Sequence, residues 1–475
     1  KILVYSPKFA HSHSSYIGKI ADILAEAGHN VSTIVSVFDA DVTDGTKLTN
    51  VIRIPPGPGI AEKYKQMKEN MASMVESAFD ASRFNPRGAY DMGKMLSGLF
   101  SAQCQALLEQ PGLIDQLIAE QYDVFFAEHF DMCGVGLSHV IKPRSLISVA
   151  ATAPGGPQLE EFGIPYSISY LPVAKMNVHS IWDRLVNIYL DFEGRIALNQ
   201  IRTSIYALYK EKFDQNFPTL MQISSNSAYV FTFMEPLIEF AISTISKVIP
   251  IGGINDKEPK TLSEDWEQVL SRRQGTILIS FGSIIKSAYL PRKVKLSIVE
   301  AVKAIPDITF IWKYEVEDEF TKEVTSKIPN LHITKWMPQL DLLAHPNVSM
   351  FITHGGMGSA QETALRGVPG IFIPLFADHP RNAAMMEHNG LGRILDKSEL
   401  ANSDRLVEMI KEVLENRRYR DNVRRVSAML RARPFTAREK LVKYTEFAAE
   451  FGPSKALRPQ STYSLLQSLL PLYCR

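Results

Sequence analysis

The chain has 475 residues, which is too long for one ordinary hydrophobic core, so its length favours two domains. Hydrophobic residues make up 45% of the chain and charged residues 22%, the balance of a globular enzyme. Lysine plus arginine (52) nearly cancels aspartate plus glutamate (51), so no whole-chain field would attract nucleic acid.

In the first half, short apolar runs alternate with helical patterns, which is typical of a parallel α/β sheet. The first strand is predicted at residues 2–5, followed by a helix from about 16 to 27 that Gly28 ends. The stretch 61–120 is mostly helical and long for a simple crossover, and such an insertion often shapes a substrate pocket. Further strands are predicted at 31–35, 51–54, 124–127 and 146–150.

The second half begins again after a charged, proline-containing stretch that resembles an interdomain linker. Strands are predicted at 276–281, 308–312, 331–334, 348–353 and 371–374, with helices between them. The sequence therefore predicts an α/β protein with two Rossmann-like domains. Their expected bounds are 1–245 for the N-terminal domain, 246–274 for the linker, 275–440 for the C-terminal domain and 441–475 for a C-terminal helix and tail.

A glycine-rich turn lies between a predicted buried strand and a helix in the second half. Its sequence is Phe351-Ile-Thr-His354-Gly-Gly-Met-Gly358-Ser-Ala-Gln-Glu362. Such a turn presents free backbone N–H groups and the positive end of a helix dipole to an anion. The segment from Ser359 to Glu362 also reads as an N-terminal capping box, so two interpretations of Glu362 remain open.

The sequence around this turn resembles the signature box of the UDP-glycosyltransferase family. Trp336-Met-Pro-Gln339 precedes the turn, and Pro374-Leu-Phe-Ala-Asp378-His379 follows it. Ser280-Phe-Gly-Ser283 and the segment 446–452 resemble two further family segments, and the residues of these motifs are most similar to those of nematode members. The resemblance covers nearly the whole chain and implies the GT-B type of fold, in which two Rossmann-like domains face a cleft.

The resemblance implies that the C-terminal domain binds a UDP-sugar, which is a co-substrate, with no cofactor and no metal. Uracil would stack on Trp336 near Gln339. The diphosphate would lie at Ser283, His354 and Gly356, with Gly358 and Ser359 in the same turn. Glu362 would accept hydrogen bonds from the ribose, and sugar hydroxyls would meet Asp378 and His379. Each residue also has a plainer interpretation, such as a core tryptophan or a helix-capping Asp378.

Two departures from the family pattern concern the donor sugar. Animal members usually have Asn in place of Gly358 and Gln in place of His379. Neither change reaches the phosphate-binding turn, so nucleotide binding stays expected while glucuronate, glucose and galactose all remain candidate donors. An imidazole is shorter than a Gln amide and aims its donor differently, so we expect His379 to select the sugar. Arg381, two residues on, could reach a glucuronate carboxylate.

The N-terminal domain should supply the catalytic base. Ala10-His11-Ser12-His13 follows the first strand, where active-site loops lie in doubly wound sheets. Alignment to the family places His13 on its catalytic histidine and makes His11 the weaker candidate. The acidic residue that orients this histidine falls on Glu128, with Asp131 as a rival.

These residues predict direct displacement with inversion, with His13 as general base and Glu128 stabilising the imidazolium. Asp39-Ala-Asp41 also spells the D-x-D pattern of metal-dependent glycosyltransferases, but no partner chemistry surrounds it. The three cysteines cannot form a disulfide framework, and one bridge would leave one thiol over.

Two other classes compete with a sugar transferase. A nicotinamide-dependent oxidoreductase would need G-x-G-x-x-G after the first strand, which this chain lacks. A catalytically silent paralogue that binds UDP-sugar and acts through a partner subunit stays open. The acceptor is expected to be a small lipophilic molecule whose pocket lies within 157–217. By resemblance the protein would be in the secretory pathway, in the endoplasmic reticulum, with membrane association and homo-oligomers both compatible, although no run of 18 apolar residues could span a bilayer.

Overall fold

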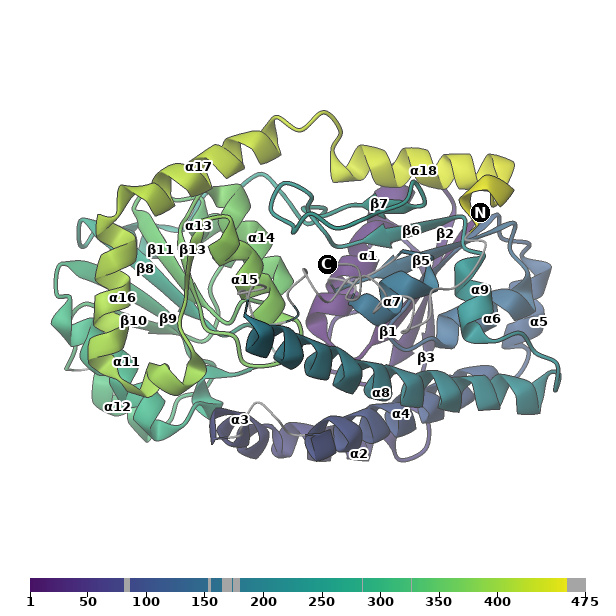
Figure 1. The fold of residues 1–475 in the computed structure, drawn as a ribbon, viewed down its shortest axis with the longest axis horizontal. Helices are drawn as coiled ribbons and strands as arrows, with labels where there is room; N and C mark the ends of the chain where they lie inside the picture. Colours follow the sequence, from purple (N-terminus) through teal and green to yellow (C-terminus); the bar gives the residue numbers. More distant parts are fainter. Residues whose placement is uncertain are drawn as a thin grey trace.

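A computed structural model describes residues 1–80, 86–152, 155–164, 173, 180–283, 285–325 and 327–458. The chain forms two α/β domains, each built on a parallel sheet (Figure 1). The strand order is β3-β2-β1-β4-β5-β6-β7 in the first sheet and β10-β9-β8-β11-β12-β13 in the second. The predicted fold class is therefore confirmed.

The first domain carries a helical insertion between its third and fourth strands. Its strands are β1 (Ile2–Lys8), β2 (Val31–Val37), β3 (Asn50–Ile54), β4 (Val124–Glu128), β5 (Ser145–Ala150), β6 (Tyr229–Thr232) and β7 (Val248–Pro250). Its helices are α1 (His11–Glu26), α2 (Ile60–Glu69), α3 (Met71–Asp80), α4 (Pro86–Leu108), α5 (Leu113–Ala119), α6 (Cys133–Ile141), α7 (Gly156–Glu161), α8 (Ile181–Lys212) and α9 (Leu220–Ser225).

The second domain alternates strands and helices more regularly. Its strands are β8 (Gly275–Ser280), β9 (Ile308–Lys313), β10 (Leu331–Thr334), β11 (Val348–Thr353), β12 (Gly370–Phe372) and β13 (Gly392–Ile394). Its helices are α10 (Glu264–Leu270), η1 (Ser287–Tyr289), α11 (Arg292–Ala304), α12 (Glu319–Thr325), α13 (Gln339–Leu343), α14 (Met357–Arg366), α15 (His379–His388), η2 (Lys397–Ala401), α16 (Ser403–Glu415) and α17 (Arg417–Arg431).

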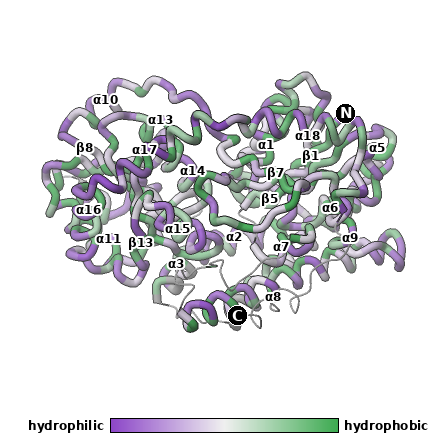
Figure 2. The backbone as a smooth tube through the Cα atoms, turned by 45° about the horizontal axis from the view of Figure 1, so that its top comes forward, coloured by the Kyte–Doolittle hydropathy of each residue, from purple (hydrophilic) through white to green (hydrophobic). Residues whose placement is uncertain are grey.

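Central strands of both sheets are buried on both faces, because helices cover each side of a parallel sheet. Every residue of β1, β2, β4 and β8 is buried, which explains their near-continuous apolar sequences. Peripheral helices such as α16 and α17 carry long hydrophilic stretches instead (Figure 2).

The stretch 246–274, expected as a linker, contains structure of its own. β7 pairs with β6 at the edge of the first sheet, and α10 belongs to the same stretch. The last described α-helix, α18 (Ala437–Phe451), returns to the first domain (Figure 1), where Ser145 donates a hydrogen bond to the Ala448 carbonyl at 2.7 Å. A short 3-10 helix, η3 (Lys455–Leu457), follows it. The tail expected after it lies outside the described residues from 459 onward.

The helical insertion of the first domain reaches the second. Val75 and Phe79 of α3 are buried within the same hydrophobic cluster as Ile285 and Leu290 of the second domain. A Cys104–Cys133 disulfide ties α4 of this insertion to α6, which follows the fourth strand. The third cysteine, Cys474, lies outside the described residues.

Candidate active site

The first half of the site lies where the strand order of the first sheet reverses, between β1 and β4. Ligands of doubly wound sheets bind at the carboxyl ends of the strands at such a point. His13 lies in the first turn of α1, directly after β1, and Glu128 is the last residue of β4. The helix begins at His11, five residues before the predicted start, so His13 is held by a helix and not by a loop.

His13 and Glu128 face each other in a buried, apolar environment. The distance between His13 Nδ1 and Glu128 Oε1 is 3.6 Å, and the two side chains are 9% and 1% exposed. Glu128 is oriented by the Phe130 backbone N–H, which donates to Glu128 Oε2 at 2.9 Å. The rings of Phe9 and Phe130 lie 4.5 and 5.5 Å from the His13 ring, so the base faces aromatic surface.

Asp131, the alternative candidate for the orienting acid, has hydrogen-bond partners other than His13. It accepts a hydrogen bond from the Tyr5 hydroxyl at 2.6 Å and another from the Cys133 N–H at 3.1 Å. Burial, followed by the negative charge of Glu128, raises the pKa of Asp131 to about 8. The geometry therefore favours Glu128 over Asp131 as the partner of His13.

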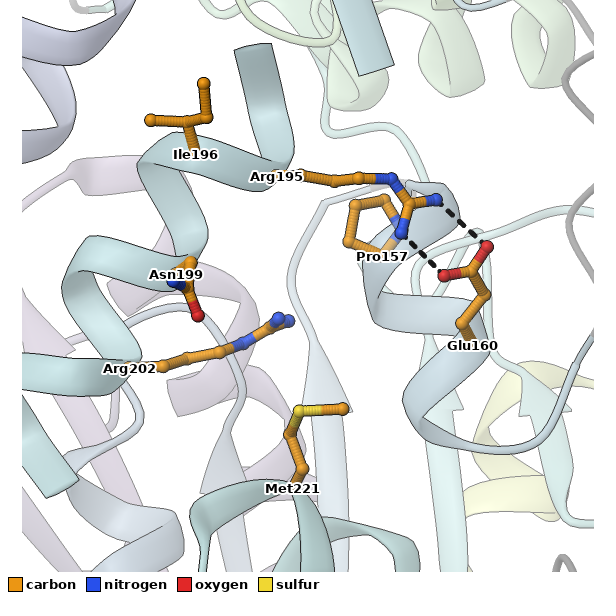
Figure 3. A pocket seen from close by; sticks show the side chains of 7 residues that line it. All are labelled: Pro157, Glu160, Arg195, Ile196, Asn199, Arg202 and Met221. Carbon is orange, nitrogen blue, oxygen red and sulfur yellow. Dashed lines mark hydrogen bonds and ion pairs between the residues drawn. The ribbon is translucent and has the colours of Figure 1, made fainter. Parts of the chain in front are cut away.

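A buried ion-pair network lies behind the catalytic strand and was not predicted from the sequence. His129, next to Glu128, approaches Glu161 at 3.0 Å, and Glu161 also pairs with Arg202. Burial is the main cause that lowers the pKa of His129 to about 3, so its imidazole is neutral. Figure 3 shows Arg202 pointing into a hollow of about 330 Å³ whose far wall carries the Arg195–Glu160 pair.

The second half of the site lies at the corresponding reversal of the second sheet, between β8 and β11. The turn after β8 carries Gly282 and Ser283, and the turn after β11 leads through Gly355 into α14. Gly355 has φ +83° and Gly282 has φ +92°, a region that favours glycine. A Cβ atom at Gly282 would lie 2.7 Å from the His354 ring, so glycine is required for this close approach.

The helix start overturns the capping-box interpretation of Ser359 and Glu362. Gly356 is the N-cap of α14 and its carbonyl accepts from the Ala360 N–H, so Ser359 already lies within the helix. Glu362 instead accepts a hydrogen bond from Gln339 Nε2 at 2.6 Å. Gln339 also lies 3.3 Å from the Ser359 hydroxyl, so these three residues form one cluster.

Two imidazoles lie at the glycine-rich turn that leads into α14, which is the expected diphosphate turn. The rings of His354 and His379 are 4.6 Å apart and nearly perpendicular, at 89°. Burial, followed by His379 and Lys313, holds the pKa of His354 well below its usual range, and burial also lowers the pKa of His379. In the free protein both rings are therefore neutral hydrogen-bonding groups and not cations.

Lys313, the last residue of β9, places a cation at this turn and was not predicted from the sequence. Its ammonium donates to the Gly282 carbonyl at 2.7 Å, lies 3.5 Å from Glu315, and sits 5.2 Å from the centroid of the Trp336 ring. Trp336 is 62% exposed, so one of the predicted donor-binding residues is an open aromatic surface and not a core residue. A lysine that ends a buried strand beside the turn was the available signal.

Two residues expected near the donor sugar, Asp378 and Arg381, have hydrogen-bond partners within the protein. Asp378 is the N-cap of α15 without a side-chain capping bond, and it accepts instead from Asn382 Nδ2 at 2.8 Å. Arg381 does not lie open for a glucuronate carboxylate. It is buried and forms a bidentate pair with Glu239 at 3.2 and 2.7 Å, so it joins the two domains.

The two half-sites approach each other across the domains. α1 and α14 contribute to one hydrophobic cluster, which includes Tyr16 and Ile17 of α1 and Met357 and Ala360 of α14. Asp39 and Asp41, the D-x-D pair, are instead bound by the Lys68 ammonium at 2.6 and 2.8 Å.

Of the stretch expected to line the acceptor pocket, 165–172 and 174–179 lie outside the described residues. Among the helices that the structure describes, none has the length and apolar character needed to cross a bilayer.

The two parallel-sheet α/β domains have the GT-B fold of glycosyltransferases. Solved structures with this fold include Os79 of O. sativa, crystallised with U2F and trichothecene (TM-score 0.64, 15% identity, 95% of this chain and 100% of that chain). Another is the calicheamicin glycosyltransferase CalG4 (TM-score 0.61, 14% identity, 95% and 99%).

The family follows from the sequence comparisons. Residues 1–467 match the model of the family described as UDP-glucoronosyl and UDP-glucosyl transferase. Relatives include ugt-47 of Caenorhabditis briggsae, which carries a UDP-glucuronosyltransferase name (30% identity, 96% of this chain and 85% of that protein). UDP-glucuronosyltransferase 3A1 of Xenopus laevis is 26% identical over 97% of this chain and 86% of its own length. The chain belongs to this family and is a UDP-dependent glycosyltransferase.

Proposed function

We propose that the protein transfers a hexosyl or glucuronosyl group from a UDP-sugar to a small lipophilic acceptor, with inversion at the anomeric carbon. His13 removes the proton from the acceptor hydroxyl, and Glu128 stabilises the imidazolium that forms. The single observation that carries this proposal is the buried His13–Glu128 pair at the switch point of the first sheet.

Charge develops on the departing UDP as the bond to the sugar breaks. The first N–H groups of α14 have no acceptor within the helix, and they face the turn that His354 and Gly282 form. Lys313 adds a positive charge beside the same turn. These groups can stabilise the leaving diphosphate without a metal ion, and we therefore propose a reaction that needs neither metal nor cofactor.

The surroundings of the base favour an apolar acceptor. Phe9 lies between His13 and two further rings, Phe38 and Phe100, whose centroids are 6.2 and 5.5 Å from its own. A charged acceptor would lose its hydration against this aromatic wall without gaining an ionic partner. A phenol or a lipophilic alcohol would instead bury apolar surface there.

His379 remains the proposed selector of the donor sugar among UDP-glucuronate, UDP-glucose and UDP-galactose. It stands at the first position of α15 against His354, at the end of the diphosphate turn. Initial rates with the three donors should change their ranking in His379→Gln. An unchanged ranking would refute this role.

The experiment that tests the proposed function compares the wild type with His13→Ala. We expect turnover to fall about a hundredfold or more, because general-base assistance is lost, while UDP affinity stays the same. Release of UDP that depends on added acceptor also separates an enzyme from a silent UDP-sugar-binding paralogue. Unchanged turnover, or loss with His11→Ala instead, would refute the assignment.

The disulfide bears on where the protein folds. Disulfides persist in oxidising compartments, so the Cys104–Cys133 bridge supports the secretory pathway, including the endoplasmic reticulum lumen.

A further inference from the structure

A hollow of about 340 Å³ lies between α17 and the C-terminal end of α14, away from the active site. The basic side chains of its lining are those of Arg366, Arg424, Arg431 and His345. No carboxylate is among the residues that line it. Since α14 begins at the diphosphate turn and its ten residues span about 15 Å, the hollow and the turn lie at opposite ends of one helix.

Arg424 and Arg431 add positive charge to this hollow, and the nearby Asp256, which feels the charge of Arg431, is already paired with Arg366. Arg424 and Arg431 are exposed residues of α17, and within the described part of the chain no ion pair engages either of them. The two carboxylates at the margin are already occupied: Asp256 pairs with Arg366 at 3.0 Å, and Glu267 with His345 at 3.3 Å.

Arg366 is held in place at the wall of the hollow. Its side chain is only 6% exposed, and its Nη2 donates to Asp256 and to the Lys257 carbonyl. These two contacts fix the guanidinium before an anion binds, so its position costs no further ordering.

The end of α14 does not repel such an anion strongly. The carbonyls of Thr363 and Ala364 accept from the N–H groups of Val368 and Gly367, and the Leu365 carbonyl accepts from the Ser427 hydroxyl. The partial negative charge of this helix end is therefore already hydrogen-bonded. Guanidinium groups are the side chains best suited to phosphate oxygens, which they bind in pairs of hydrogen bonds.

We propose that this hollow is a second anion site that takes a phosphate-type dianion, either a free phosphorylated molecule or the headgroup of a phospholipid. Arg424 and Arg431 of α17 bind the phosphate oxygens, and Arg366, at the C-terminal end of α14, completes the site. The remaining arginines of α17, Arg417, Arg418, Arg420 and Arg425, attract the anion without touching it.

The test measures binding of inorganic pyrophosphate to the full chain by equilibrium dialysis, with UDP present to fill the diphosphate turn. Arg424→Gln/Arg431→Gln should weaken binding at least about tenfold, because two charge-assisted hydrogen-bond donors are lost. The matched control is Arg417→Gln/Arg418→Gln, which removes the same charge from the same helix outside the hollow and should change affinity less than about twofold. Unchanged UDP affinity in both variants shows that they are folded.

Equal loss in the two variants would reduce the effect to diffuse attraction by α17 and overturn the site, as would full retention in Arg424→Gln/Arg431→Gln. A second arm separates the two sources of phosphate. Vesicles of phosphatidylcholine with phosphatidic acid should sediment the wild type but not Arg424→Gln/Arg431→Gln if a lipid headgroup is the ligand. Pyrophosphate binding without vesicle binding identifies a free phosphorylated ligand in the same site.

Discussion

Replacing Glu128 by Gln tests whether its charge stabilises the imidazolium of His13. At 3.6 Å, with an effective dielectric constant near 20, the attraction between the two ions is on the order of 4–5 kcal/mol. The Gln amide keeps the size and one acceptor but loses the charge. The neutral amide oxygen still attracts the imidazolium and recovers part of this energy, so we expect kcat to fall about 10²- to 10³-fold.

The assay is steady-state UDP release with a saturating phenol acceptor, together with calorimetric UDP binding. UDP affinity should not change, since Glu128 belongs to the first domain and the diphosphate turn to the second. The matched control is Asp131→Asn. The pKa of Asp131 is about 8, so this residue is mostly neutral at pH 7 and an amide replaces it with little change of charge. If Asp131→Asn lowers kcat as much as Glu128→Gln, the assignment of the orienting acid is wrong.

Three other outcomes follow from the same contacts. Gly282→Ala should lower Tm and weaken UDP binding, because its Cβ would lie 2.7 Å from the His354 ring, while Gly358→Ala, whose Cβ meets no atom within 4 Å, should leave UDP binding intact. Arg381→Gln should destabilise the protein by about 3–5 kcal/mol in urea unfolding, since it leaves Glu239 buried and unpaired; a loss confined to UDP-glucuronate turnover would point to the carboxylate contact instead. The pKa of Asp131 is higher in the folded protein than in the unfolded chain, so its contribution to stability is complete below about pH 4 and is lost as the pH rises to about 8. The Tm of Asp131→Asn relative to wild type should therefore rise between pH 5 and pH 8.5. A difference in Tm that does not change with pH would contradict this.

The central strands were predictable from the sequence because they are buried on both faces and read as apolar runs. β6, β7 and β13 were missed. β7 and β13 have only three residues each; β12 is equally short but was predicted, because its apolar run continues to the buried Ile373. The start of α1 was missed for a different reason. Ala10 is its N-cap and offers no side-chain cap, so the sequence carries no start signal before His11.

The site was predictable where a motif fixed it and not where the fold brings distant residues together. The glycine turn and Glu362 lie in one continuous box, whereas the Gln339–Glu362 hydrogen bond joins two helices. The roles of Lys313 and Arg381 depend on partners 31 and 142 residues away; the position of Lys313 at the end of a buried strand was a local signal, but the identity of its partner was not.

The return of α18 to the first domain has a consequence for motion between the domains. The chain passes between them after β7 and again after α17, and these two connections touch: Arg433, which follows α17, donates to the carbonyl of Gly252, which follows β7, at 3.3 Å. Two adjacent connections favour a hinge at this place, so opening of the site should be a rotation about it and not a free reorientation. The packing of α3 on the second domain opposes such rotation from the far side, because opening would expose Val75 and Phe79 to water. Opening would also have to break the buried Arg381–Glu239 pair, so both contacts favour the closed arrangement of the domains.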